Sequence, residues 1–176
     1  MSAFLLASSA VGCGGGGAPP PDLTPEARIL FADDDGGFAA SELNAMAATL
    51  GVALTPDSAG LVDGACGEPI GHTVTFRDLN GDGSAEVILD YGNTCWSGMA
   101  GTSVTVFVRG AGGDLEPNFG VPGMIAEVRE SPDGGYADLL IGGPGFCWSL
   151  WSWDGQVYEP VRNEPQAPGG CDNRGG

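Results

Sequence analysis

The stretch that decides the fold runs Asp78-Leu-Asn80-Gly-Asp82-Gly-Ser-Ala-Glu86-Val-Ile-Leu89. Side chains that carry oxygen recur at every second position from Asp78 to Asp82, a glycine follows, and Glu86 closes the set. A hard cation such as Ca²⁺ takes several oxygen ligands, and a tight turn supplies them from alternate residues. The apolar runs at 74–76 and 87–89 are typical of short strands. The stretch therefore predicts a β-hairpin whose tip folds around a metal ion.

The loop has a metal-free alternative, because Asp-Gly and Asn-Gly pairs form tight turns without any ion. The carboxylates favour the metal, since Asp78, Asp82 and Glu86 would otherwise repel one another. We expect Ca²⁺ to play a structural role here and to hold the register of the hairpin. The expected affinity is low, with a dissociation constant of about 10⁻⁴–10⁻³ M, as in extracellular calcium modules.

The composition is that of a small acidic globular protein. The chain has 176 residues, which allows one domain, or one domain with a tail, and 42% of them are hydrophobic. The 32 glycines and 13 prolines favour turns and short strands over long helices. A net charge of −17 disfavours binding to nucleic acid or anionic lipid and attracts divalent cations and basic partners.

The N-terminus is typical of an export signal. Residues 4–11 form an apolar run that is too short to span a bilayer. The segment Ala10-Val-Gly-Cys13 resembles a bacterial lipobox, in which the cysteine is lipidated and becomes the new N-terminus. This predicts a signal peptide over residues 1–12 and a Gly/Pro tether over residues 13–22. An ordinary cleaved signal, or an incorrect start codon, is the alternative.

The cysteines fit an exported protein. Lipidation of Cys13 would leave Cys66, Cys95, Cys147 and Cys171, an even number that predicts two disulfides. Cys66 and Cys95 lie equally far from the centre of the acidic loop, so folding the hairpin would bring them opposite each other. We therefore favour Cys66–Cys95 and Cys147–Cys171, with free thiols as the alternative.

Residues 23–65 are expected to be mainly helical. One short helix is predicted from Pro25 to Phe31. A second helix is predicted to have Ser41 as its N-cap and to stop at Gly51. The connection between them resembles a degenerate EF-hand loop. Its weaker candidate metal ligands are Asp33, Asp35 and Glu42. The first ligand position is occupied by a phenylalanine, so an acidic connecting loop without metal is the favoured interpretation.

The rest of the chain contains an internal repeat. Residues 82–97 align without gaps with residues 134–149, sharing Gly, Ala, Cys, Trp and Ser positions. The second copy has lost the metal ligands, because Pro132 and Gly134 stand where the first copy has Asn80 and Asp82. Each copy predicts the order strand, loop, strand, turn, strand. Residues 163–176 are expected to form a polar tail held only by its cysteine.

The loop from Asp78 to Gly83, followed by Ala-Glu-Val, resembles the FG-GAP/VCBS repeats of integrin α-chain propellers and many bacterial surface proteins. The resemblance implies a calcium ion with five ligands: Asp78, Asn80, Asp82, the backbone carbonyl of Ser84, and Glu86. It covers about residues 66–162. It implies a mainly β fold with a short N-terminal helical segment, in which two decayed β-hairpin units form an open or partly closed, propeller-blade-like antiparallel sheet. Two copies are too few to close a propeller.

An aromatic group is a second candidate site. Trp151, Trp153 and Tyr158 flank the predicted Asp154-Gly155 hairpin turn, and Trp151 is expected to face Tyr158 across the strands. Aromatic faces on a sheet can stack on sugars or receive a partner's side chain. The alternative, which burial tendencies favour, is that these rings belong to the core.

Nothing in the sequence indicates a catalytic centre. His72 is the only histidine, it has no partner set typical of nucleophilic catalysis, and no phosphate-binding loop follows a strand. The leading hypothesis is a non-enzymatic, calcium-stabilised, lipid-anchored domain of the cell envelope with a protein or glycan ligand. One alternative is an inhibitor or sensor that captures a basic protein through its acidic surface. The other is a glycan hydrolase with a carboxylate pair.

Overall fold

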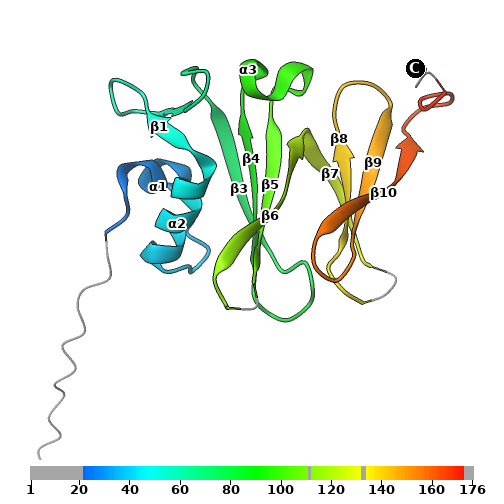
Figure 1. The fold of residues 1–176 in the computed structure, drawn as a ribbon, viewed down its shortest axis with the longest axis horizontal. Helices are drawn as coiled ribbons and strands as arrows, with labels where there is room; N and C mark the ends of the chain where they lie inside the picture. The colour runs from blue at the N-terminus through cyan, green and yellow to red at the C-terminus, as the bar shows by residue number, and fades with distance from the viewer. Residues whose placement is uncertain (1–21, 111, 132–133, 173–176) are drawn as a thin grey trace, which may run out of the picture.

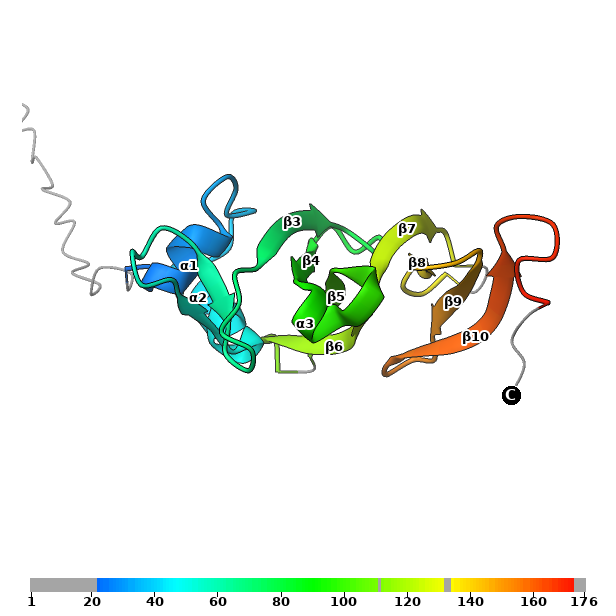
Figure 2. The ribbon, with the colours of Figure 1, turned by 90° about the horizontal axis from the view of Figure 1, so that it is seen from above.

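The computed structural model describes residues 22–172 except 111, 132 and 133. The predicted signal peptide, the lipidation site Cys13 and all but the last residue of the tether lie outside these residues. The described chain is mainly β, as predicted, with its strands in three antiparallel sheets, none of them closed. In Figures 1 and 2 a helical layer, a first four-stranded sheet and a second four-stranded sheet follow one another along the long axis.

The N-terminal layer contains two helices. Helix α1 (Pro25–Leu30) is capped by the Thr24 hydroxyl, and α2 (Ala40–Leu50) ends at Gly51 in the left-handed conformation, as predicted. The predicted Ser41 N-cap is wrong, because the N-cap of α2 is Ala39, two residues earlier. The N–H of Ala39 there donates to the Glu42 carboxylate at 3.0 Å, which satisfies the helix entry without a capping hydroxyl.

The same layer contains a small hairpin that the sequence did not predict. Strands β1 (Val52–Leu54) and β2 (Leu61–Asp63) pair in antiparallel register within the segment expected to be helical. These strands are too short to show a period-2 pattern. They become visible only through their packing, since Leu61 joins the core beneath the helices.

The first large sheet is a meander in chain order: β3 (Gly71–Arg77), β4 (Glu86–Gly92), β5 (Ser103–Arg109) and β6 (Leu115–Pro122). Short helical turns, α3 (Thr94–Ser97) and η1 (Gly98–Ala100), connect β4 to β5. Both inner strands are buried on both faces. On β4, Val87 and Leu89 pack under the helices, whereas Ile88 faces the second sheet. The first sheet therefore separates two hydrophobic cores.

The second large sheet repeats the same meander: β7 (Met124–Arg129), β8 (Asp138–Gly142), β9 (Cys147–Trp153) and β10 (Tyr158–Pro165). Each unit thus has four strands and not the predicted three. Residues 163–165, predicted to begin a polar tail, form the end of β10. They are held there because Glu164 pairs with Trp148 across the ladder and is bound by Arg129 at 2.8 Å.

The outer face of the second sheet is covered by charged side chains. Leu140 and Leu150 are paired on β8 and β9 and are almost fully buried, although neither belongs to the core between the sheets. Arg129 on β7 reaches Glu164 on β10 across these two strands and also binds Glu127 at 2.6 Å. An ion-pair network therefore closes the stack at this end, as α1 and α2 close it at the other.

The internal repeat is structural only in part. Residues 86–92 form β4 and the aligned residues 138–142 form β8, in agreement with the alignment. The shared Cys-Trp pair lies in different elements, because Cys95 and Trp96 belong to α3 whereas Cys147 and Trp148 begin β9. The two aligned tryptophans therefore occupy different positions in the two units.

The disulfides follow the favoured pairing. The structure joins Cys66 to Cys95 and Cys147 to Cys171. The first links the turn before β3 to α3, and the second holds the C-terminal segment against the start of β9. Two disulfides are compatible with an extracellular or periplasmic location. Among the described residues, no helix is both long enough and apolar enough to cross a membrane.

Candidate metal-binding loop at the junction of the sheets

The acidic loop connects β3 to β4, and the predicted hairpin is confirmed. The two strands, each seven residues long, pair from Gly71 with Gly92 to Arg77 with Glu86. The loop joins the end of β3 to the start of β4, beyond the last of these pairs. Gly81 and Gly83 have φ angles of 76° and 88°, which only glycine adopts readily. The chain turns back here because glycine adopts a positive φ without the steric cost that a side chain at the same position would add.

The side-chain oxygens of the loop point inward to backbone N–H groups. Asp78 accepts from Gly81 at 2.7 Å through Oδ1 and from Gly83 at 2.9 Å through Oδ2. Asp82 accepts from the N–H of Ser84 at 2.7 Å, and Asn80 accepts from the N–H of Asp82 at 2.9 Å. These bonds lower the pKa of the Asp82 carboxyl, chiefly through the Ser84 N–H. The hydrogen bonds of the loop therefore favour the ionised form of Asp82.

Glu86 differs from the other ligand candidates because it is buried. Its residue is 1% exposed, and its Oε2 accepts from the N–H of Leu79 at 2.8 Å. Burial raises the pKa of the Glu86 carboxyl, and the charges of Asp82 and Asp78 raise it further. The three carboxylates thus form one electrostatic group.

The loop also contacts the second unit. The carbonyl oxygen of Leu79 accepts from the N–H of Ala137 at 2.6 Å, and the hydroxyl of Tyr136 lies 3.5 Å from Glu86 Oε1. Leu79 is itself buried in the core between the sheets. An ion held by this loop would therefore act on the junction of the two sheets, and not only on the first unit as expected from the sequence.

The donor chemistry of the loop suits Ca²⁺, since every candidate ligand is an oxygen and the charges of Asp78 and Asp82 act on the buried carboxylate of Glu86. The side chains do not already converge on one point. Within residues 22–172, leaving aside the undescribed positions, no three His, Cys, Asp or Glu side chains are grouped as a metal site. Metal binding would require the side chains of the loop to move together, while an oxygen that accepts one N–H keeps a second lone pair for the ion.

The weaker candidate loop is engaged elsewhere. Glu42 caps α2 and forms an ion pair with Arg109 at 2.8 Å. Asp35 accepts from the N–H of Gly37, while Asp33 lies exposed on the same loop. The Phe38 ring stacks on the ring of Phe76 in β3, and the Arg109 guanidinium lies over the Phe38 ring. The structure thus uses this loop to attach the helical layer to the first sheet.

The aromatic group faces inward. Tyr158 is 4% exposed and donates to the carbonyl of Ala137 at 2.9 Å, while Trp151 and Trp153 pack against the core between the sheets. The predicted cross-strand pair is wrong, because Tyr158 pairs with Trp153 and Trp151 pairs with Pro160. Four residues, 154–157, separate β9 from β10 in place of the predicted two-residue turn, and this shifts the register.

Sequence reasoning missed Tyr136 as a neighbour of the site. It lies in the second copy, where the metal ligands have been lost, and it aligns with Ser84 of the first copy. Burial and the charge of Glu86 raise its pKa. The only available signal was the aromatic residue within an otherwise glycine-rich loop. His72, expected to pack, lies with Nε2 at 3.2 Å from the carbonyl oxygen of Ile29 in α1.

Comparisons with protein-family models, with curated proteins and with solved structures find no match to this chain.

Proposed function

We propose that this chain is a non-enzymatic, calcium-stabilised module of the cell envelope. The observation that carries the proposal is the position of the acidic loop. It contributes a buried carboxylate, Glu86, to the junction of the two sheets and is bonded there through Leu79 to Ala137. Neutralising the carboxylates with one divalent ion would stabilise both the loop and the junction.

The arrangement of the sheets supports a relation to propeller blades. Each sheet is a four-stranded antiparallel meander, and the two follow one another in chain order with a core between them. We propose that they are two blade-like FG-GAP/VCBS units. Unlike blades in a closed ring, they are covered at both ends, by α1 and α2 and by the ion pairs around Arg129.

The envelope location is proposed from the N-terminal pattern together with the disulfides. Lipidation at Cys13 would anchor the domain through the Gly/Pro tether, and the oxidised cysteines require a compartment that permits them. A protein or glycan is the proposed class of partner. Because Trp153 and Tyr158 belong to the core, the partner would bind elsewhere than on the predicted aromatic face.

Thermal unfolding with and without Ca²⁺ tests the proposal. With a dissociation constant of about 10⁻⁴–10⁻³ M, 10 mM Ca²⁺ should add about 1.4–2.7 kcal/mol to the free energy of unfolding. For a chain of this size that shift raises the melting temperature by about 3–10 °C. Asp82→Ala should remove the shift, because it deletes a ligand from the exposed side of the loop.

Asp114→Ala is the matched control, since Asp114 is an exposed acid in the turn between β5 and β6. It should keep the calcium shift of the wild type. A melting temperature that is the same in Ca²⁺ and in chelator would overturn the proposal. So would an equal loss of the shift in Asp82→Ala and Asp114→Ala, since that would show general attraction of the ion to an acidic surface.

A further inference from the structure

A second acid lies at the opposite end of β4 from the calcium loop. Asp90 follows Glu86 and Ile88 on the face of β4 that looks toward the second sheet. Its cross-strand neighbours are Thr73 on β3 and Val104 on β5. Among the described residues, Asp90 Oδ1 is the one buried side-chain oxygen or nitrogen without a hydrogen-bond partner.

This carboxylate is unfavourable for the fold. Burial raises the pKa of Asp90, and within the described part of the chain no hydrogen bond to Oδ1 opposes that effect. An apolar residue would suit the position, since Val104 beside it is fully buried. A strained or unsatisfied group in a cavity is a common property of binding sites, where a ligand supplies the missing interaction.

Asp90 lines a groove with a volume of about 460 Å³, which also includes Thr73, Thr102, Met124 and Ile125. We call this the Asp90 groove. The residue as a whole is partly exposed although Oδ1 is not, so its accessible atoms lie toward the groove. A cationic group would therefore meet the carboxylate from the groove side, at Oδ2, and would offset the negative charge that Oδ2 shares with the buried Oδ1.

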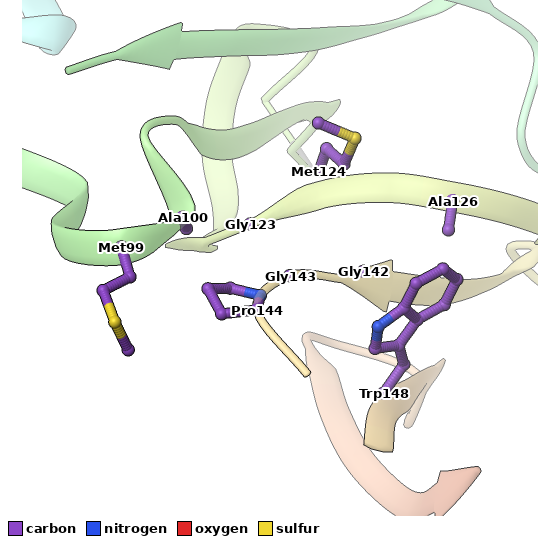
Figure 3. A pocket seen from close by; sticks show the side chains of 9 residues that line it. All are labelled: Met99, Ala100, Gly123, Met124, Ala126, Gly142, Gly143, Pro144 and Trp148. Carbon is purple, nitrogen blue, oxygen red and sulfur yellow. The ribbon is translucent and has the colours of Figure 1, made fainter. Parts of the chain in front are cut away.

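A separate apolar cavity with a volume of about 300 Å³ also includes Met124 in its lining. Figure 3 shows Met99, Pro144 and Trp148 around it, with the Met124 side chain on the opposite side of its strand from Trp148. Met124 is 51% exposed, so a flexible thioether side chain borders the Asp90 groove.

We propose that the Asp90 groove binds a small organic amine with an apolar body. The ammonium group would meet the Asp90 carboxylate and the hydroxyls of Thr73 and Thr102, and the apolar part would pack against Met124 and Ile125. An organic cation fits better than a metal ion, because one carboxylate and two hydroxyls are too few ligands for Ca²⁺. The net charge of −17 favours any cation at this surface.

The test is a titration with hexylamine, followed by amide chemical shifts in NMR spectra, in the presence of a calcium chelator. Hexylamine should shift the signals of Thr73, Thr102 and Met124. It should bind at least tenfold more tightly than hexanol, which lacks the charge, and than methylamine, which lacks the apolar chain. Asp90→Asn should reduce the affinity for hexylamine to that for hexanol.

Asp114→Asn is the control for general attraction to the acidic surface, and it should bind hexylamine as the wild type does. The proposal is overturned if hexanol binds as tightly as hexylamine, or if Asp90→Asn and Asp114→Asn have equal affinities. The site lies at the opposite end of β4 from the acidic loop and the titration contains no Ca²⁺. Its failure would therefore leave the calcium proposal untouched, and failure of the calcium proposal would leave this one untouched.

Discussion

Glu86 and Asp90 are two acids on one face of one strand, and the structure treats them differently. Both point between the sheets, and burial raises the pKa of each. Glu86 accepts the N–H of Leu79 and lies beside Tyr136 of the second unit. Asp90 has an oxygen without a partner, among the described residues. The same side-chain chemistry is therefore integrated into the fold at one end of β4 and unsupported at the other.

The difference shows what a buried acid contributes. At the loop end, the Glu86 carboxylate satisfies a backbone donor that would otherwise be buried alone, so the fold depends on an acceptor there. At the other end, nothing in the described fold depends on the charge of Asp90. Removing the acceptor at position 86 should therefore destabilise the protein, whereas removing the charge at position 90 should stabilise it.

The largest expected effect is the loss of the acceptor in Glu86→Ala. The Leu79 N–H would remain buried without a partner, which should lower the free energy of unfolding by about 2 kcal/mol. Glu86→Gln keeps an oxygen for that N–H and should change stability much less. Urea unfolding in a calcium chelator measures both. If the two variants lose equal stability, the hydrogen bond to Leu79 is not what Glu86 contributes.

A smaller effect of opposite sign is expected for Asp90→Asn. Removing an unpartnered buried charge should raise the free energy of unfolding by about 1 kcal/mol at pH 8, because an amide is less costly to bury than a carboxylate. Urea unfolding gives the value, with Asp114→Asn as an exposed control that should lie within about 0.5 kcal/mol of the wild type. Destabilisation by Asp90→Asn would mean that the carboxylate supports the fold.

The stabilisation by Asp90→Asn should depend on pH. The pKa of Asp90 is raised above the ordinary 3.8, so the folded protein holds this proton more tightly than the unfolded chain. The penalty of the charge is therefore complete above the folded pKa and disappears as pH falls toward 3.8. The advantage of Asp90→Asn should shrink over the same range in urea unfolding measured at successive pH values.

For Asp82→Asn, the change in the free energy of unfolding should have the opposite sign to that of Asp90→Asn. The pKa of Asp82 is lowered from 3.8 by hydrogen bonds from Ser84 and Asn80, so its charged form stabilises the fold above that pH. The cost of Asp82→Asn should be greatest at pH 8 and should disappear as pH falls below 3.8. Parallel pH profiles for Asp82→Asn and Asp90→Asn would contradict the assigned difference between the two acids.

The sequence predicted those features that depend on local pattern. The acidic hairpin followed from alternating oxygens between two apolar runs, and the Cys66–Cys95 pair followed from its symmetry about that hairpin. Strand β6 was missed because Pro117 and Pro122 interrupt it. Prolines are tolerated there because β6 is an edge strand, where one side of the backbone needs no ladder hydrogen bonds.

The contacts between the two sheets could not be predicted. The spacing of Glu86 and Asp90 shows that they share a strand face, but not which acid meets a donor from the second unit. The positions of Tyr136 and Met124 depend on how the second meander packs on the first, and no local pattern encodes that arrangement. The candidate ligands of the loop were therefore predictable, whereas the Asp90 groove was not.

The smallest expected effect is that of Tyr136→Phe, which tests which of its two neighbours holds the Glu86 carboxylate. The Tyr136 hydroxyl is 3.5 Å from Glu86 Oε1, too long for a strong hydrogen bond, whereas the Leu79 N–H is at 2.8 Å. Tyr136→Phe keeps the ring and its packing on Trp153, so it should cost less than about 0.5 kcal/mol in urea unfolding with chelator. A loss as large as that of Glu86→Ala would show that the link to the second unit, and not the loop's own N–H, holds the buried acid.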